Sequence, residues 1–129
     1  MARIIGREVM SVCVYVDDFR EAVDFYCHSL GLEKSKDVSD SACFLRLNDN
    51  SNAIYLEGGH VRVDHGAGAT GVSFMLLVDS AIDAHHELRE QGIRFVHDSP
   101  QDMGGGSHWF RLYDPAGNII EIVSSPVGA

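Results

Sequence analysis

The chain has 129 residues, of which 45% are hydrophobic, and a formal net charge of −9 at pH 7. This length suits one compact domain, and the apolar content argues against a disordered chain. The negative charge, with no basic stretch, excludes nucleic acid and anionic membrane surfaces as expected partners. No apolar run is long enough for a membrane span or a signal peptide. Three widely spaced cysteines, Cys13, Cys27 and Cys43, favour reduced thiols in a cytoplasmic protein over a disulfide framework.

The first predicted elements are a strand and a helix. Residues 10–16 alternate, with Val12, Val14 and Val16 on one face of a strand and Ser11, Cys13 and Tyr15 on the other. Asp18 is followed by Glu21 at the spacing of a capping box, so a helix is expected to begin there. An apolar stripe runs from Phe19 to Leu30, and Gly31 is placed to end the helix. A short strand from Leu32 and a hairpin of residues 42–47 and 53–57 complete this half.

The second half of the sequence repeats this plan. Residues 73–79 match residues 11–17, Ser80 or Asp79 caps a second helix, and Gly92 ends it as Gly31 ends the first. The apolar stripe of this helix contains Ala81, Ala84, His85 and Leu88. We therefore predict two βαβββ modules, residues 8–58 and 71–125, joined by a linker of residues 59–70 within a single domain spanning residues 1–129.

The last hairpin, residues 109–123, contains a carboxylate in an unusual place. If residues 114–117 form the turn, Leu112 pairs with Ile119 and Phe110 pairs with Glu121. Glu121 would then share a face with Phe110, while Trp109 would face the opposite way. The glycine run before this hairpin, within residues 99–107, favours a hairpin connection over a phosphate-binding loop, with a lid over a ligand site as the alternative.

Two motifs carry a family resemblance: residues 113–121, Tyr-Asp-Pro-Ala-Gly-Asn-Ile-Ile-Glu, and residues 17–31, with their Phe-Tyr and Leu-Gly pairs. With the paired modules, they resemble the vicinal oxygen chelate superfamily, which contains glyoxalase I, extradiol dioxygenases, and fosfomycin- and bleomycin-resistance proteins. The resemblance implies an α+β fold in which curved mixed sheets surround a concave cup, with the helices on the outer side. It also implies a ligand in the cup and, often, a homodimer.

The resemblance further implies four metal-ligand positions, which in this sequence are Ser11, Tyr55, Ser73 and Glu121. Only Glu121 is a good ligand for a transition metal, because such ions prefer imidazole, carboxylate or thiolate groups. We therefore expect no metal and no cofactor. The predicted lining of the cup is Ser11, Cys13, Tyr15, Phe44, Arg46, Tyr55, Ser73, Met75, His108 and Phe110.

Glu121 is expected either as a structural residue, exposed at the rim or hydrogen-bonded to a neighbour, or as a pocket carboxylate. In the pocket it needs a partner or a raised pKa, since an unpaired charge in an apolar hollow is costly. Arg46 and His108 are the candidates from the predicted hairpin faces. Of the seven histidines, we expect only His108 on the cup face and the other six on the solvated surface. Cys13 as a nucleophile would need a base or cation beside it, so that role is disfavoured.

Three functions remain open from the sequence. The first is metal-free binding of a small organic molecule, partly aromatic or polar, in the manner of bleomycin-resistance proteins. The second is a lyase, isomerase or dioxygenase of the same superfamily that uses Glu121 as a metal ligand or as a catalytic general base. The third is a regulatory or scaffold domain whose cup binds nothing physiological. The fold alone does not decide among them.

Overall fold

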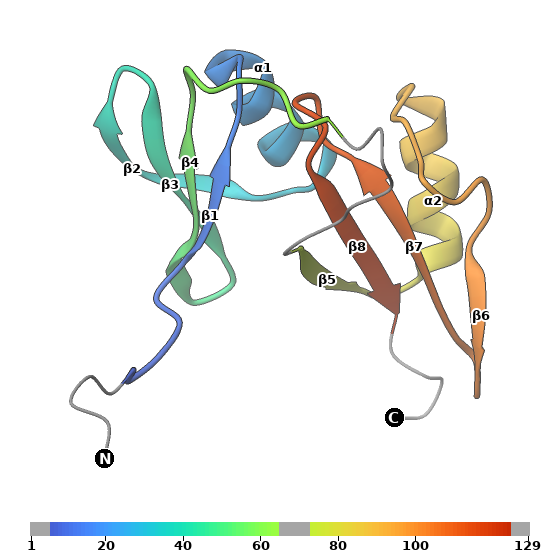
Figure 1. Cartoon of the computed structure of the whole chain (residues 1–129). Helices are drawn as coiled ribbons and strands as arrows, with labels where there is room; N and C mark the ends of the chain where they lie inside the picture. Colours follow the sequence, from blue (N-terminus) through green and yellow to red (C-terminus); the bar gives the residue numbers. More distant parts are fainter. Residues whose placement is uncertain (1–5, 65–72, 125–129) are drawn as a thin grey trace. The chain divides into compact units, whose positions relative to one another are not determined.

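The computed structural model describes residues 6–64 and 73–124 of the chain. These residues belong to two compact units, 1–60 and 61–129. Each unit contains one four-stranded mixed sheet and helical structure that packs on it, which is an α+β arrangement (Figure 1). No helix in the described ranges combines the length and the apolar character needed to cross a membrane.

The first unit has the order strand, helix, strand, strand, strand. Its elements are β1 (Val12–Tyr15), α1 (Phe19–Asp24), the π-helix η1 (Phe25–Ser29), β2 (Glu33–Ser39), β3 (Ala42–Leu47) and β4 (Asn50–Glu57). The strands lie in the order β1-β4-β3-β2. Strand β1 is parallel to β4, and the other neighbours are antiparallel.

The second unit has the same topology. Its elements are β5 (Phe74–Val78), α2 (Ala81–Glu90), β6 (Gln101–Gly104), β7 (Ser107–Tyr113) and β8 (Ile119–Ser124). The strands lie in the order β5-β8-β7-β6, and the first strand is again parallel to the last. The predicted fold class, two βαβββ modules with mixed sheets, is therefore confirmed.

Both helices begin as their capping residues predict. An oxygen of Asp18 accepts a hydrogen bond from the Glu21 amide at 3.1 Å, and Ser80 Oγ accepts one from the Asp83 amide at 3.1 Å. The predicted single α-helix in the first unit is wrong in its second half, where the chain widens into η1. There the Leu30 amide donates to the Phe25 carbonyl at 3.2 Å, five residues back, as a π-turn requires.

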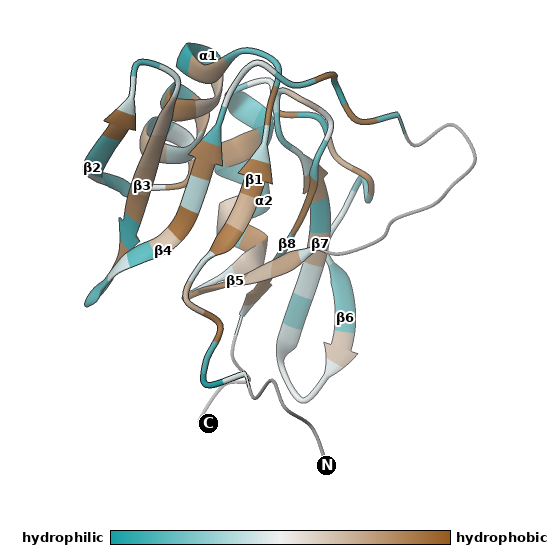
Figure 2. Ribbon diagram, turned by 60° about the vertical axis from the view of Figure 1, so that its left-hand side comes forward, coloured by the Kyte–Doolittle hydropathy of each residue, from teal (hydrophilic) through white to brown (hydrophobic). Residues whose placement is uncertain are grey.

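Each sheet buries one face beneath its helix. In the first unit Val14, Cys43, Leu45 and Leu56 are buried together with Ala22, Phe25 and Tyr26 of the helical segment. In the second unit Phe110, Leu112, Ile120 and Ile122 are buried with His85 and Leu88 of α2. The intervening residues point to the opposite side, which we call the helix-free face of each unit. The alternation is visible along β4 as changes between hydrophobic and hydrophilic colours (Figure 2).

The predicted register of the last hairpin is wrong by one residue. Leu112 pairs with Ile120 and Phe110 pairs with Ile122, so that Glu121 lies opposite Arg111. The reason is a longer turn, in which the Asp114 amide donates to the Asn118 carbonyl at 2.8 Å. The buried Asp114 carboxylate accepts hydrogen bonds from the amides of Ala116 and Asn118, at 3.0 and 2.7 Å, and holds this turn closed.

The glycine run is a hairpin connection, as predicted, and joins β6 to β7. Gly104, Gly105 and Gly106 all have positive φ angles, of 86°, 66° and 85°, in a region that suits glycine and few other residues. The strand expected directly after α2 is reduced to a single bridge between Phe95 and Leu112, and β6 forms later in the chain.

Candidate functional site

The two serines at the predicted metal-ligand positions make the same contact in their own units. Ser11 Oγ donates to the Asn52 carbonyl at 2.6 Å, and Ser73 Oγ donates to the Ile119 carbonyl at 2.6 Å. In both units the acceptor lies in, or at the start of, the last strand, so each hydroxyl ties the beginning of the first strand to its parallel partner. These hydroxyl protons are therefore engaged by the protein itself.

Tyr55, the third position, is hydrogen-bonded to a carboxylate. Its hydroxyl donates to Glu57 Oε1 at 2.5 Å, and His60 Nε2 lies 2.6 Å from Glu57 Oε2. The hydrogen bond to Glu57 raises the pKa of Tyr55 to about 12, so the phenol stays protonated at neutral pH. The same bond, followed by the one with His60, lowers the pKa of Glu57. A neutral phenol that donates its proton to a neighbour is a poor metal ligand.

Glu121, the fourth position, is ion-paired with Arg111. Arg111 Nε lies 2.5 Å from Glu121 Oε1, and the side chains are 36% and 16% exposed. The expectation that His108 would share the face of Glu121 is wrong, because the register shift places His108 and Phe110 on the other side of β7. Arg46, the other candidate, is an exposed residue at a bulge of β3 in the first unit.

Phe110 belongs to the core of the second unit and does not line an open face. It is fully buried and contacts the rings of His85 and Phe95 at centroid distances of 4.8 and 5.6 Å. His85 is itself 5% exposed and stacks on Phe95 at 4.0 Å, so the expectation of a solvated His85 is wrong. Its Nε2 lies 3.2 Å from the His97 carbonyl, which satisfies the buried ring.

Taken together, the four positions do not fit a catalytic metal. Two carry hydroxyls bonded to carbonyl groups, one carries a protonated phenol, and the single carboxylate is paired with a guanidinium. Within residues 6–64 and 73–124, no group of three or more His, Cys, Asp or Glu side chains is arranged to hold a metal ion.

The helix-free face of the first unit gathers aromatic and polar side chains. Tyr55 lies beside Cys13 on one neighbouring strand and Phe44 on the other, and the Phe44 and Tyr55 ring centroids are 5.3 Å apart. Tyr15 meets the His60 ring at 4.8 Å, and the neighbouring Cys13 raises the pKa of Tyr15. Four residues predicted as ligand contacts, Cys13, Tyr15, Phe44 and Tyr55, thus lie on one face.

Glu57 and His60 complete this network, and the sequence reasoning did not select them. The signal for Glu57 was its spacing of two from Tyr55, which places both side chains on the same face of β4. His60 was assigned to the linker, yet its amide donates to the Val16 carbonyl at 2.9 Å and holds the residue beside the sheet.

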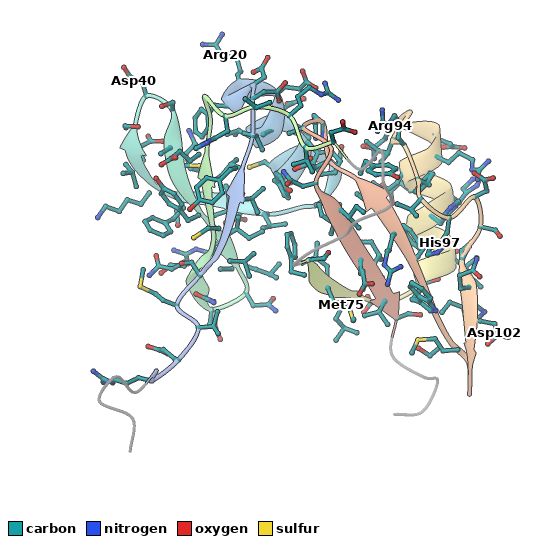
Figure 3. The ribbon with its side chains drawn as sticks, in the orientation of Figure 1. Arg20, Asp40, Met75, Arg94, His97 and Asp102 are labelled. Carbon is teal, nitrogen blue, oxygen red and sulfur yellow. The ribbon has the colours of Figure 1, made fainter. Side chains whose placement is uncertain are left out.

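The helix-free face of the second unit is apolar around one ion pair. Strand pairing sets Met75 beside Glu121 and Trp109 beside Val123, with Arg111 on the other side of Glu121. Met75 and Leu77 are 61% and 69% exposed, and the Met75 side chain extends from β5 (Figure 3). The Arg111 guanidinium carbon lies 5.0 Å from the centroid of the Trp109 ring. The sequence would have predicted Arg111 and Trp109 on the face of Glu121 only with the correct hairpin register.

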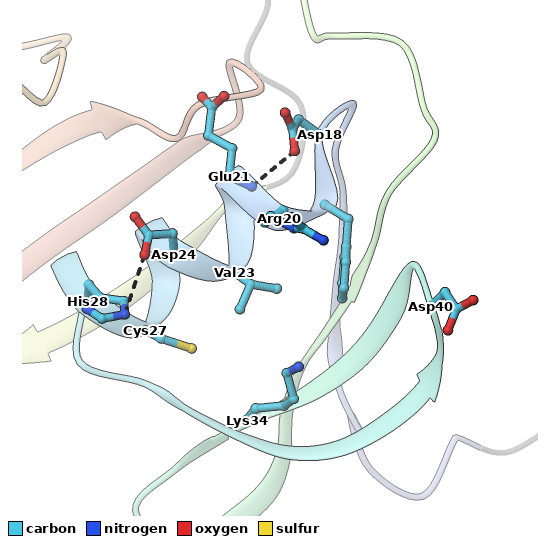
Figure 4. Close-up of a pocket in the computed structure, with 10 residues that line it drawn as sticks. Asp18, Arg20, Glu21, Val23, Asp24, Cys27, His28, Lys34 and Asp40 are labelled. Carbon is cyan, nitrogen blue, oxygen red and sulfur yellow. Dashed lines mark hydrogen bonds and ion pairs between the residues drawn. The ribbon is translucent and has the colours of Figure 1, made fainter.

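A separate pocket of about 760 Å³ lies on the helical side of the first unit, between α1, η1 and β2 (Figure 4). Val23, Cys27 and Lys34 line it, among both acidic and basic side chains. Lys34 Nζ lies 3.1 Å from Asp37 Oδ1, so its charge is compensated locally. The pocket contains none of the four metal-ligand positions.

Comparison with known proteins identifies the scaffold. The sequence matches the model of the Glyoxalase/Bleomycin resistance protein/Dioxygenase superfamily over residues 9–122. No curated protein matches the sequence significantly.

Several solved structures are similar to the chain in fold. Lactoylglutathione lyase from Agrobacterium tumefaciens has a TM-score of 0.68 and 21% identity, over 96% of this chain and 98% of that one. A superfamily member from Sphaerobacter thermophilus has a TM-score of 0.72 and 22% identity, over 95% and 100%. TnmS3, an antibiotic binding protein from Streptomyces sp. CB03234, has a TM-score of 0.68 and 19% identity, over 95% and 98%. Identities this low establish the fold alone.

Proposed function

Since the chain belongs to the glyoxalase/bleomycin resistance protein/dioxygenase superfamily, we propose that it is a small-molecule-binding protein that takes an organic ligand without a metal ion. The ligand lies against the helix-free face of a sheet. No catalytic step is part of this proposal.

One observation carries it: at each of the four positions where the superfamily's enzymes hold their metal, the polar group is already bonded within its own unit. The symmetry of the two serines is the most informative part. Ser11 and Ser73 occupy equivalent places in two units of equal topology and make equivalent bonds to carbonyl groups at 2.6 Å. In each unit the serine hydroxyl bonds the first strand to the last one. The same bond at both equivalent positions favours a structural role for the two serines.

The residues of the helix-free faces supply what an organic ligand needs. Aromatic rings offer broad apolar contact, and a few fixed polar groups set orientation. Phe44, Tyr55 and Tyr15 provide this in the first unit, and Trp109, Met75 and Arg111 in the second. TnmS3, described as an antibiotic binding protein, has the same fold, so the scaffold accommodates this kind of function.

We also propose a homodimer in the cytoplasm, as expected from the resemblance and from the three free cysteines. Exposed apolar side chains such as Met75 and Leu77 are suited to cover by a ligand or by a second copy of the chain. Light scattering coupled to size-exclusion chromatography measures the mass of the particle directly. A monomer at working concentration would contradict the proposed homodimer and leave the binding proposal unaffected.

The proposed binding is tested by a thermal-shift screen against metabolites and antibiotics, run in parallel with and without a chelator. A ligand that binds only the folded state raises the melting temperature by mass action. We expect compounds that raise it equally in both arms. A ligand effect that disappears with chelator and returns with Zn²⁺, Ni²⁺, Mn²⁺ or Fe²⁺ would contradict metal-free binding, and a screen without any stabilising compound would remove the function.

A further inference from the structure

We infer that the ligand is an aromatic monocarboxylate whose carboxylate is bound by Arg111 on the helix-free face of the second unit. This inference names the ligand class of the proposed function and therefore rests on it. The geometry of the guanidinium carries the argument.

Arg111 is held in place by two contacts that leave its outer end available. Its Nε donates to Glu121 Oε1 at 2.5 Å, and its guanidinium lies over the Trp109 ring at 5.0 Å. Within residues 61–64 and 73–124, no hydrogen-bond partner is found for its two terminal NH₂ groups. The side chain is 36% exposed, so it reaches solvent. A guanidinium fixed at Nε and by stacking presents its terminal nitrogens as a rigid fork, which matches a planar carboxylate.

The surroundings of this fork are apolar. Across the strands from Glu121 and Val123 lie Met75 and Leu77, which are exposed and on the same face as Arg111. A flat ring placed against these side chains is removed from water while its carboxylate reaches the fork. A ligand that is charged throughout would gain nothing from this part of the surface.

The charge balance favours a single negative charge on the ligand. Glu121 already neutralises much of the Arg111 charge, and the whole chain carries a net charge of −9. A dianion such as a phosphate ester would be repelled by the Glu121 carboxylate and by the protein field. A carboxylate carries a single negative charge, so it pairs with the guanidinium and is repelled less than a dianion.

The test uses 3-phenylpropanoate and its neutral analogue 3-phenylpropanamide with the full-length protein. The chain has a single tryptophan, Trp109, so its indole N–H gives one unambiguous signal in a ¹H–¹⁵N spectrum. We expect the carboxylate to shift this signal in a saturable manner and the amide to bind about tenfold more weakly, because a charge-assisted hydrogen bond is lost. Phenylphosphate, a dianion of similar shape, should also bind more weakly than the carboxylate.

Two arginine variants provide the control. Arg111→Gln should lose the preference for carboxylate over amide. Arg89→Gln, which removes another guanidinium stacked on an aromatic ring of the same unit, should keep it. Equal affinity for acid and amide in the wild type, an unchanged preference in Arg111→Gln, or no shift of the indole signal would each overturn the inference. The proposed function survives that failure if the library screen yields neutral or cationic ligands, and falls only if the screen yields none.

Discussion

Arg111 and Glu121 face each other across β7 and β8 and form an ion pair with a nitrogen–oxygen distance of 2.5 Å. The pair joins the two strands of the hairpin that carries the family motif. It also gives Glu121 a structural contact, since one of its carboxylate oxygens accepts a hydrogen bond from the guanidinium.

The pair should contribute measurably to stability. Glu121→Gln removes the charge and keeps the shape, and we expect a loss of about 1 kcal/mol in the free energy of unfolding, because the pair is only partly exposed. A double-mutant cycle with Arg111→Gln, measured by urea denaturation, isolates the interaction. The Lys34–Asp37 pair, which is more exposed, serves as the control and should show weaker coupling. A Glu121→Gln variant that keeps full stability but loses a measured turnover would instead make Glu121 catalytic.

The serine hydroxyls should act as strand ties. Ser11→Ala removes a partly buried hydrogen bond to the Asn52 carbonyl and should lower the free energy of unfolding by about 1 kcal/mol. Ser73→Ala should cost less, because its bond is exposed to solvent. Ser99→Ala, at an exposed position, is the matched control. Equal stability of all three variants would mean that the hydroxyl bonds carry no structural role.

Tyr55 should ionise well above an ordinary tyrosine. Its folded pKa of about 12 lies above the ordinary value of 10.0, chiefly through the hydrogen bond to Glu57. The stability from this bond is therefore fully present below pH 10 and is lost as the pH rises through about 12. Ultraviolet titration of the phenolate, with Tyr55→Phe to assign the transition, should show it moving to lower pH in Glu57→Gln. An unchanged transition in that variant would exclude Glu57 as the cause.

Cys13 and Cys43 should differ in reactivity according to burial. Cys13 is exposed, whereas Cys43 is fully buried and desolvation raises its pKa to about 11. Because the thiolate is the reactive form, we expect iodoacetamide to modify Cys13 in the folded protein and Cys43 only after denaturation. Peptide mapping by mass spectrometry distinguishes them. Early modification of Cys43 would indicate that the helix opens from the sheet in the native state.

Local patterns in the sequence predicted most of the fold. Asp18 and Ser80 begin their helices because a side-chain oxygen next to free amides is a local arrangement. The alternation of β1 likewise placed Cys13 and Tyr15 on one face. These features depend on a few neighbouring residues, so they can be predicted from a single sequence.

The site was predicted less well, because it depends on register. One additional residue in the turn after Asp114 moves Glu121 from the side of Phe110 to the side of Arg111. The hydrogen bonds of Asp114 select that longer turn, and its loop sequence is compatible with both lengths. The π-turn in η1 is a similar case, since its apolar spacing resembles that of an ordinary helix.

Metal analysis of the protein purified without chelator tests the proposed metal independence most directly. Inductively coupled plasma mass spectrometry should find Zn, Ni, Mn and Fe far below one equivalent per chain. The same measurement after incubation with each ion and desalting should give the same result, since Ser11, Tyr55, Ser73 and Glu121 are bonded to protein groups. One equivalent of any of these metals in the wild type, and its absence from a Glu121→Ala variant, would contradict the proposed metal independence.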